Sequence, residues 1–343
     1  MQFDHEAYAD ACARDLARNE FVGLTPEQRA QIHERAQLYR AVFRAHPHLH
    51  NALSVALLAG LFLADAYVLL ALPAQLGVPE GGLGRLLAVA AITGALHGFL
   101  VCNIVTYTVH EGAAHNLIIQ GQGRTARALR WLAHNACRFF LADPEYYTQG
   151  HGAHHRDLGT PDDGSFTQAV RGRRLLRALL PMAPFFSGSD YFPWRPQERT
   201  PSRARSVLLT NLYVGAFATA MTLRFGPLFM AVALLLIGNW LSFVLDRLRE
   251  SVEHLHMPLD RELGTRELGL GLWGLLLGGG PWGQPCHLSH HLAPALPWYL
   301  QLCLHADLCR ILTPAQRRQF FAAPVVGVPG LLWSIAFPRR SAP

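Results

Sequence analysis

The sequence predicts an all-α integral membrane protein: four transmembrane helices in two hairpins, with a cytoplasmic helical cap that carries clustered histidines. Three observations predict this. Half of the 343 residues are hydrophobic and only 16% are charged, the apolar residues form four long runs, and the histidines gather just outside them. This composition excludes a disordered chain, and the length exceeds that of a small disulfide-stabilised fold. We expect residues 1–343 to form one domain.

Four apolar stretches are long enough to cross a membrane as helices, which takes about 20 residues. They are residues 51–77, 86–109, 207–223 and 227–245. Short connections after the first and third stretches predict two tight hairpins, 51–109 and 207–245. The alternative is a soluble all-α protein, but its helices rarely run this long without charge.

The arginines predict the orientation. All 30 basic residues are arginine, and 28 of them lie in the long segments 1–50, 110–206 and 246–343, whereas Arg85 and Arg224 alone lie in the short turns. The positive-inside rule therefore puts the long segments and both termini in the cytoplasm. The chain contains arginine but no lysine, a composition that suggests a bacterial protein, and its membrane is therefore expected to be the bacterial inner membrane. No cleavable signal peptide is expected, because residues 1–50 are polar throughout.

Shorter elements are expected in the cytoplasmic segments. Thr25 to Gln28 form a capping box that predicts a helix from Pro26 to about Phe43. The apolar segments 129–141, 175–186 and 268–278 are too short to cross a membrane, so we expect them at the interface or packed within the cap.

Charge and cysteine content narrow the function classes. The net charge is +6, but the arginines form no basic helix or aromatic-basic motif, so no nucleic-acid partner is expected. The six cysteines form no CxxC pair and are expected to be reduced and mostly structural.

Three histidine clusters lie on the cytoplasmic side of the predicted spans. They read HEGAAHN, QGHGAHHRD and QPCHLSHHLAP and contain His110 and His115; His151, His154 and His155; and His287, His290 and His291. The last two clusters share the pattern HxxHH, which places three imidazoles on one helix face. The first pair is five residues apart, about 140° around an ideal helix. It therefore needs a distorted helix end, or its members bind different ions.

Clusters of this size favour metal binding. Imidazole suits zinc, copper, iron and nickel. Eight histidines exceed the four ligands of a tetrahedral zinc and would fit two ions of higher coordination number with open positions. Two redox-active irons are therefore predicted. The paired ExxH motifs of soluble ferritin-like sites are missing, which disfavours that class.

The order HxxxxH, HxxHH, HxxHH on one side of two hairpins resembles the membrane fatty acid desaturase and hydroxylase superfamily. DRLRESVEHLHMP (246–258) is similar to the family segment in which a lone histidine after Glu supplies a further ligand, here His254. CHLSHHLAPALPWY (286–299) is similar to the third box. Many relatives have an Asn before that box, whereas Gln284 and Cys286 stand there in this chain, which puts an Asn-mediated water contact in doubt. The resemblance implies nine iron ligands: His110, His115, His151, His154, His155, His254, His287, His290 and His291.

Other polar residues receive weaker predictions. His256 follows His254 by two, and alternation points it away from the metals. The remaining histidines are expected to be surface or packing residues: His46, His48, His50, His134 and His305. Several acids could accept the free N–H of a ligating imidazole, without a choice among them: Glu111, Asp157, Asp162, Asp163, Glu250 and Glu253. Asp65 and His97 lie at matching depths in the first hairpin and are predicted to contact each other, as a structural pair or lining a substrate channel.

The resemblance implies an oxidoreductase that uses two iron ions and dioxygen to desaturate an acyl chain carried on a lipid, coenzyme A or acyl carrier protein. No dinucleotide fingerprint or iron–sulfur motif is visible, so electrons are expected from a separate ferredoxin or b-type cytochrome with its reductase. A hydroxylase, ketolase, acetylenase or other tailoring oxygenase of the superfamily is the main alternative. A histidine-rich metal transporter or scaffold is more remote, because transporters place ligands near the bilayer midplane.

Overall fold

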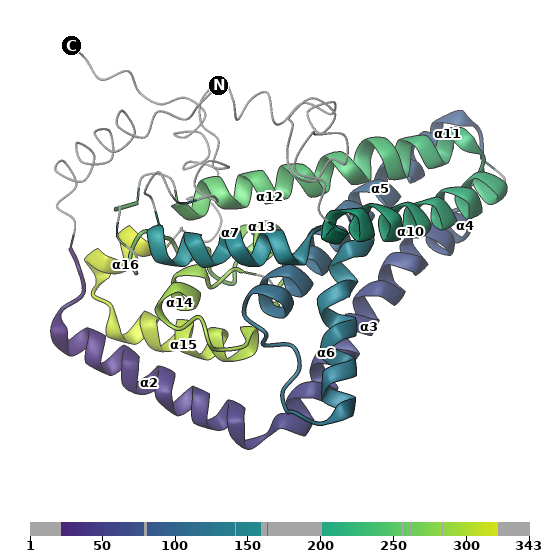
Figure 1. Ribbon diagram of the computed structural model, residues 1–343. Helices are drawn as coiled ribbons and strands as arrows, with labels where there is room; N and C mark the ends of the chain where they lie inside the picture. Colours follow the sequence, from purple (N-terminus) through teal and green to yellow (C-terminus); the bar gives the residue numbers. More distant parts are fainter. Residues whose placement is uncertain are drawn as a thin grey trace, which may run out of the picture. The chain divides into compact units, whose positions relative to one another are not determined.

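The computed structural model describes residues 22–78, 81–140, 142–158, 163, 201–254, 257–258, 260, 262–282 and 284–321. Every regular element among them is a helix, apart from one isolated parallel bridge between Glu267 and Phe321 (Figure 1). This confirms the predicted all-α class.

The chain divides into two compact units. One comprises His48–Tyr147 and Arg177–Asp246, and we call it the span unit. The other comprises Met1–Pro47, Thr148–Leu176 and Arg247–Pro343, and we call it the terminal unit because both chain ends belong to it.

Among the described residues, four helices are long and apolar enough to cross a membrane: Pro47–Leu70, Leu83–Ala114, Pro201–Phe225 and Pro227–His254. The first and third are α3 and α10. The second is α5 (Leu83–Val105) continued by η1 (Thr106–Ala114), and the fourth joins α11 (Pro227–Met230), η4 (Ala231–Gly238) and α12 (Asn239–His254). Each of the four predicted spans thus corresponds to a helix with the length and composition to cross a membrane.

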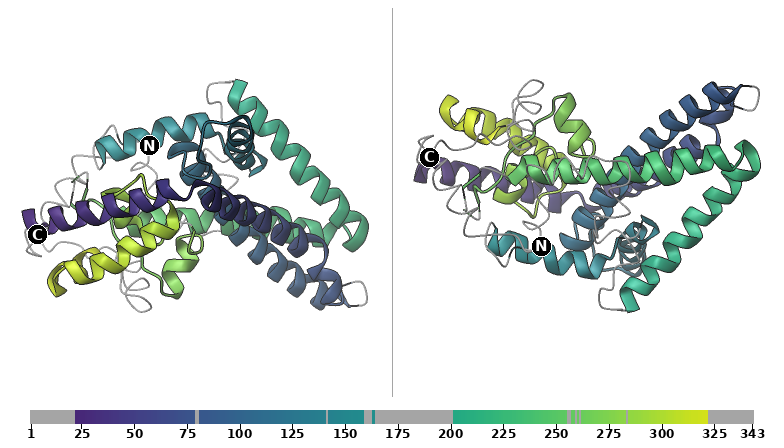
Figure 2. Two further views of the ribbon diagram at one scale, coloured as in Figure 1. Left: turned by 90° about the horizontal axis from the view of Figure 1, so that it is seen from below. Right: turned by 90° about the horizontal axis from the view of Figure 1, so that it is seen from above.

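The end of the first span differs from the prediction. The first helix ends at Leu70 rather than residue 77, because the chain breaks there and Pro73 opens a separate short helix, α4 (Leu72–Gln75). The turn between α10 and α11 follows the sequence closely, since Gly226 adopts a φ of 90° and Pro227 starts the next helix (Figure 2).

Small residues let α5 and η4 approach closely in the span unit. A Cβ atom added to Gly98 would lie 2.5 Å from the carbonyl oxygen of Gly238, and one added to Gly94 would lie 2.5 Å from that of Ala233. Because lipid provides no hydrophobic drive between helices, such close backbone packing is a main source of their association.

A buried polar contact joins three spans. Nδ1 of His97 on α5 lies 2.6 Å from Oδ1 of Asp65 on α3, and the hydroxyl of Tyr213 on α10 donates to Oδ2 of Asp65 at 2.8 Å. Asp65 is fully buried. The predicted contact between Asp65 and His97 is confirmed, and Tyr213 is a third member that the sequence did not indicate.

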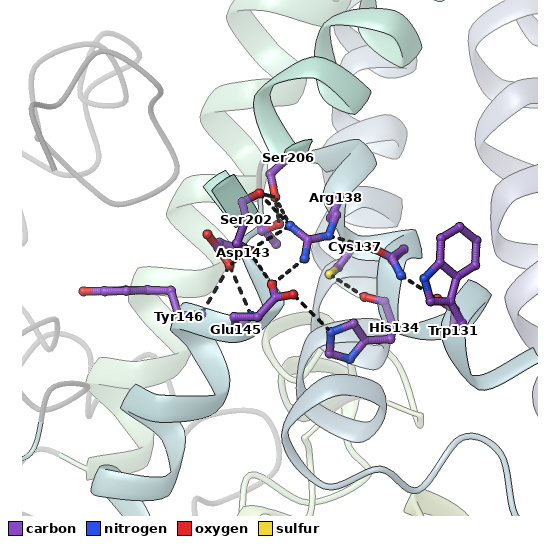
Figure 3. Close-up of polar contacts among 11 residues, drawn as sticks. Trp131, His134, Cys137, Arg138, Asp143, Glu145, Tyr146, Ser202 and Ser206 are labelled. Carbon is purple, nitrogen blue, oxygen red and sulfur yellow. Dashed lines mark hydrogen bonds and ion pairs between the residues drawn. The ribbon is translucent and has the colours of Figure 1, made fainter. Parts of the chain in front are cut away.

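The connection from the second to the third span is held by Arg138 in η2 (Cys137–Phe140), which is 1% exposed. Its guanidinium donates to Asn135, to Ser202 and Ser206 at the start of α10, and to Glu145 near the start of α7 (Pro144–Asp157) (Figure 3). Every nitrogen of this buried guanidinium is therefore used in fixing local structure.

In the terminal unit, α2 (Pro26–Ala45) lies along α15 (Trp298–Ile311), as Figures 1 and 2 show. Their apolar faces, with α14 (His287–Leu292) and α16 (Pro314–Phe320), enclose a core that contains Leu304 and Phe320. The predicted capping box at Thr25 is present and opens α2 at Pro26.

Two of the three short apolar segments are described. The described part of segment 129–141, residues 129–140, forms the end of α6 (Arg124–Ala136) and then η2, and segment 268–278 contains α13 (Leu272–Leu277). Both are helices too short to span a bilayer, as predicted. Segment 175–186 lies outside the described residues.

Candidate metal centre

The second histidine box lies on α7. This helix carries His151, His154 and His155 at positions i, i+3 and i+4, so the three side chains project from the same face. Nδ1 of the buried His154 lies 3.0 and 3.1 Å from the two carboxylate oxygens of Asp163. A carboxylate only accepts, so Nδ1 carries the proton and Nε2 presents a lone pair.

His254 is oriented in a similar way at the last residue of α12. Its Nδ1 donates to the carbonyl oxygen of Gly264 at 3.1 Å, and its Nε2 lies 3.1 Å from Nε2 of His287. The backbone of residues after α12 therefore fixes this imidazole in the tautomer that leaves Nε2 available to a metal.

The third box forms α14, a helix of six residues that begins at His287. His287, His290 and His291 are all buried. Burial, together with the neighbouring imidazoles, holds the pKa of His287 well below its usual value. This imidazole is therefore neutral at pH 7, the form in which histidine binds metals.

One ring nitrogen from each of His154, His254, His287 and His291 lies within 4.8 Å of the other three. We call these residues the four-histidine group. All four side chains are buried. Two of them have Nδ1 engaged by Asp163 or Gly264, which leaves Nε2 of each available. This donor set fits a divalent transition metal.

A second set of imidazoles lies in the same unit. Nε2 of His155 is 3.0 Å from Nε2 of His151 and 2.9 Å from Nε2 of His290, and we call these the three-histidine group. The amide nitrogen of Gln301 on α15 lies 3.3 Å from Nδ1 of His290 and donates to the carbonyl of Leu296. The two groups adjoin, since the rings of His155 and His291 are 4.5 Å apart.

The first box, His110 and His115, belongs to the span unit. Its backbone geometry brings the two histidines together despite their five-residue spacing. The second span continues past residue 109 as η1, a π-helix, and the amide of His115 donates to the carbonyl of His110 at 3.1 Å. A helix with i→i+5 bonds superposes residues five apart, and the two rings are 4.8 Å apart. The distorted helix end that the spacing required is present. Burial lowers the pKa of His115 to about 4.

The acids named from the sequence separate into different roles. Asp163 is the hydrogen-bond partner of His154. Oε1 of Glu111 lies 3.4 Å from Nδ1 of His110, and Oε2 of Glu253 lies 3.6 Å from Nε2 of His287. Asp157 pairs with Arg156. Asp162 and His256 lie outside the described residues.

Two residues near the groups escaped sequence reasoning. Glu267 and Gln301 are each at most 1% exposed, one before α13 and the other on α15. Gln301 is a single polar residue inside an apolar segment, which is a weak signal, and Glu267 follows Thr265 and Arg266 in a polar stretch that gives none. Of the histidines outside the boxes, His50 is buried and its Nε2 donates to the carbonyl oxygen of Leu117 at 2.6 Å, a packing role as expected.

The family model described as Fatty acid desaturase matches residues 83–323. The chain belongs to the fatty acid desaturase family. The match covers more than half of the chain and includes all nine predicted ligand histidines, which confirms the resemblance drawn from the boxes. Among curated proteins and solved structures, none matches the chain. The family places this desaturase-family protein in a superfamily of oxidoreductases that includes desaturases and hydroxylases, many of which use two irons.

Proposed function

We propose that the chain is a dioxygen-dependent acyl desaturase of the bacterial inner membrane, with its histidine boxes on the cytoplasmic side. The two irons would be held by the nine box and lone histidines: His110, His115, His151, His154, His155, His254, His287, His290 and His291. The four-histidine group would hold one ion. The three-histidine group would contribute to holding the second.

The observation that carries this proposal is the convergence of seven histidines from α7, α12 and α14 into two adjoining groups. Residues more than 100 positions apart in sequence supply them. Their nitrogens approach to about 3 Å, and ring positions are fixed by Asp163 and Gly264. Imidazoles held this close have little structural use without an ion between them.

The protein residues would hold, orient and shield the reacting centre. Asp163 and the Gly264 carbonyl keep the protons of His154 and His254 on Nδ1, and burial of the four-histidine group excludes water. When bound, iron supplies dioxygen activation: two hydrogens leave the acyl chain and dioxygen becomes two waters, with two electrons and two protons from outside.

The partners follow from this chemistry. An unactivated acyl chain is apolar and would reach the centre from the membrane, carried on a lipid, coenzyme A or acyl carrier protein. Electrons would come from a ferredoxin, or from a b-type cytochrome with its reductase. The arginine-rich cytoplasmic segments would favour an acidic donor surface.

Product analysis tests the proposal. Cells that express the chain with a ferredoxin and reductase are fed a deuterated saturated fatty acid, and total lipids are analysed by mass spectrometry. We expect a product that has lost two deuterium atoms, that needs dioxygen and that disappears in His154→Ala. The matched control is His33→Ala, an exposed histidine on α2. A product with one added oxygen would instead assign a hydroxylase, and no oxidised product would contradict an oxidative role.

A further inference from the structure

Glu267 is a fully buried acid that none of the predicted ligand roles uses. Its carboxylate accepts three hydrogen bonds. Oε1 receives the Ser289 hydroxyl at 2.5 Å and Nδ1–H of His305 at 2.8 Å, and Oε2 receives the Ser289 amide at 3.1 Å. Ser289 is also fully buried. Hydrogen bonds to an ionised carboxylate are among the stronger ones in proteins, particularly away from water.

Ser289 stands in the middle of the third histidine box, between His287 and His290 on α14. This helix has only six residues, and no side chain caps its start at Cys286. A helix this short has little stability of its own, so its position depends on external contacts. Glu267 supplies two of them, to the main chain and the side chain of one residue.

The segment that carries Glu267 also touches the other ligand-bearing helix of this unit. The Gly264 carbonyl accepts from Nδ1 of His254, and the amide of Arg266 donates to the carbonyl of Glu253 at 2.8 Å. No larger residue fits at position 264, because an added Cβ would lie 2.5 Å from the Asp260 carbonyl oxygen. Residues 264–267 therefore form a strap between the end of α12 and α14.

The far side of the strap is fixed as well. The amide of Glu267 donates to the carbonyl of Phe320 at 2.8 Å, and the amide of Gly269 donates to the carbonyl of Pro285 at 2.8 Å, just before the third box. His305 approaches Glu267 from α15. Phe320 and His305, which are not among the predicted metal ligands, thus help to hold Glu267 in place.

We propose that Glu267 is a positioning residue of the metal centre: through Ser289 it sets the place of α14, and with it His287, His290 and His291, relative to His254. This inference rests on the proposed metal role of those histidines. Glu267 is not itself a metal ligand, and it acts on the ligand histidines through the position of α14.

Glu267→Gln tests the proposal because it keeps the size of the side chain. An amide has one acceptor oxygen and a donor nitrogen, so it cannot accept from three donors, and its nitrogen must face one of them. Ser289→Ala removes only the hydroxyl anchor. Ile32→Ala is the control for general destabilisation, because Ile32 is a buried residue of α2 in the core of the same unit.

The measurement is Co²⁺ titration of metal-stripped, detergent-purified full-length protein, followed by visible absorption and thermal unfolding. We expect Glu267→Gln to weaken Co²⁺ binding on the order of tenfold and to shift the absorption bands of the bound ion. Ser289→Ala should have a smaller effect, and the double variant should match Glu267→Gln alone. Ile32→Ala should lower the unfolding temperature with unchanged bands.

Three results would overturn the inference. Wild-type bands and affinity in Glu267→Gln would show that the carboxylate does not position the ligands, and strictly additive effects would show that it does not act through Ser289. An extra ion that is lost in Cys286→Ser would make Glu267 a ligand of its own site with Cys286 and His305. A wild-type protein that gives no cobalt bands would contradict the proposed function itself.

Discussion

His110 and His115 face each other at a ring separation of 4.8 Å because the chain between them forms a π-helical turn. In an α-helix the same residues would diverge by about 140°. The second span thus changes its winding at the point where it leaves the apolar segment, which brings an HxxxxH pair to one point. Such turns occur frequently at functional sites.

If this pair contributes to one of the two proposed ions, His115→Ala removes a ligand from that ion alone. We expect bound iron to fall by about half relative to wild type, because second-ion affinity drops while the four-histidine group is intact. Elemental analysis of purified protein measures this, with His33→Ala as the control. Full iron content in His115→Ala would remove the pair from the ligand set.

The contact among Asp65, His97 and Tyr213 should stabilise the span unit. Tyr213→Phe leaves Oδ2 of a fully buried carboxylate without its hydroxyl donor, and we expect a loss of about 1–2 kcal/mol in the free energy of unfolding. The matched control is Tyr67→Phe, where the hydroxyl donates to Gln75 at an exposed site. Unfolding in detergent measures both variants, and equal losses would contradict a special role for the buried contact.

Close packing between α5 and η4 predicts a difference between two glycine substitutions. Gly98→Ala drives a methyl group into the Gly238 carbonyl oxygen, so we expect a loss of about 1–3 kcal/mol. Gly60 on α3 has no atom within 4 Å of an added Cβ, and Gly60→Ala should stay within about 1 kcal/mol of wild type. Thermal unfolding of both variants tests this. Similar effects would show that α5 and η4 are less tightly packed.

The stability that Glu145 gives to the connection around Arg138 should decrease at acidic pH. Burial raises the pKa of Glu145, but hydrogen bonds from Ser202 and its own amide, with the Arg138 charge, outweigh this and lower the pKa from 4.5 to about 2. A pKa that is lowered on folding gives stability that is present above pH 4.5 and lost as pH falls toward 2. Glu145 is half exposed, so the effect is expected to be small and to weaken with salt.

The measurement is the unfolding temperature of wild type and Glu145→Gln between pH 3 and 7. The wild-type advantage should shrink on acidification below about pH 4.5. Parallel curves over this range would show that the carboxylate charge adds nothing to stability.

Much of the fold follows directly from hydropathy. Each of the four apolar runs coincides with a long helix, because a span must satisfy its own backbone hydrogen bonds. The capping box at Thr25 fixes the start of α2 for a local reason as well. The early end of the first span at Leu70 was missed, since residues 71–77 carry no charge and continue the apolar run, although Pro73 marks the break.

The site was predictable to the extent that its signals are local. The HxxHH spacing places three histidines on α7 and three on α14, where the structure has them. The sequence pattern did not reveal the hydrogen-bond partners that distant segments supply to these residues. Gly264 offers a main-chain carbonyl, which no residue type reveals, and Glu267 acts on a serine 22 positions away.

The most direct test of the central claim is the metal content of detergent-purified protein, by elemental analysis with Mössbauer spectroscopy, beside the double variant His154→Ala/His290→Ala. This variant removes one imidazole from each histidine group of the terminal unit. We predict about two irons per chain in the wild type, lost in the variant. A single zinc, or no bound metal after anaerobic preparation, would contradict the oxidative centre and favour a metal-transport or scaffold role.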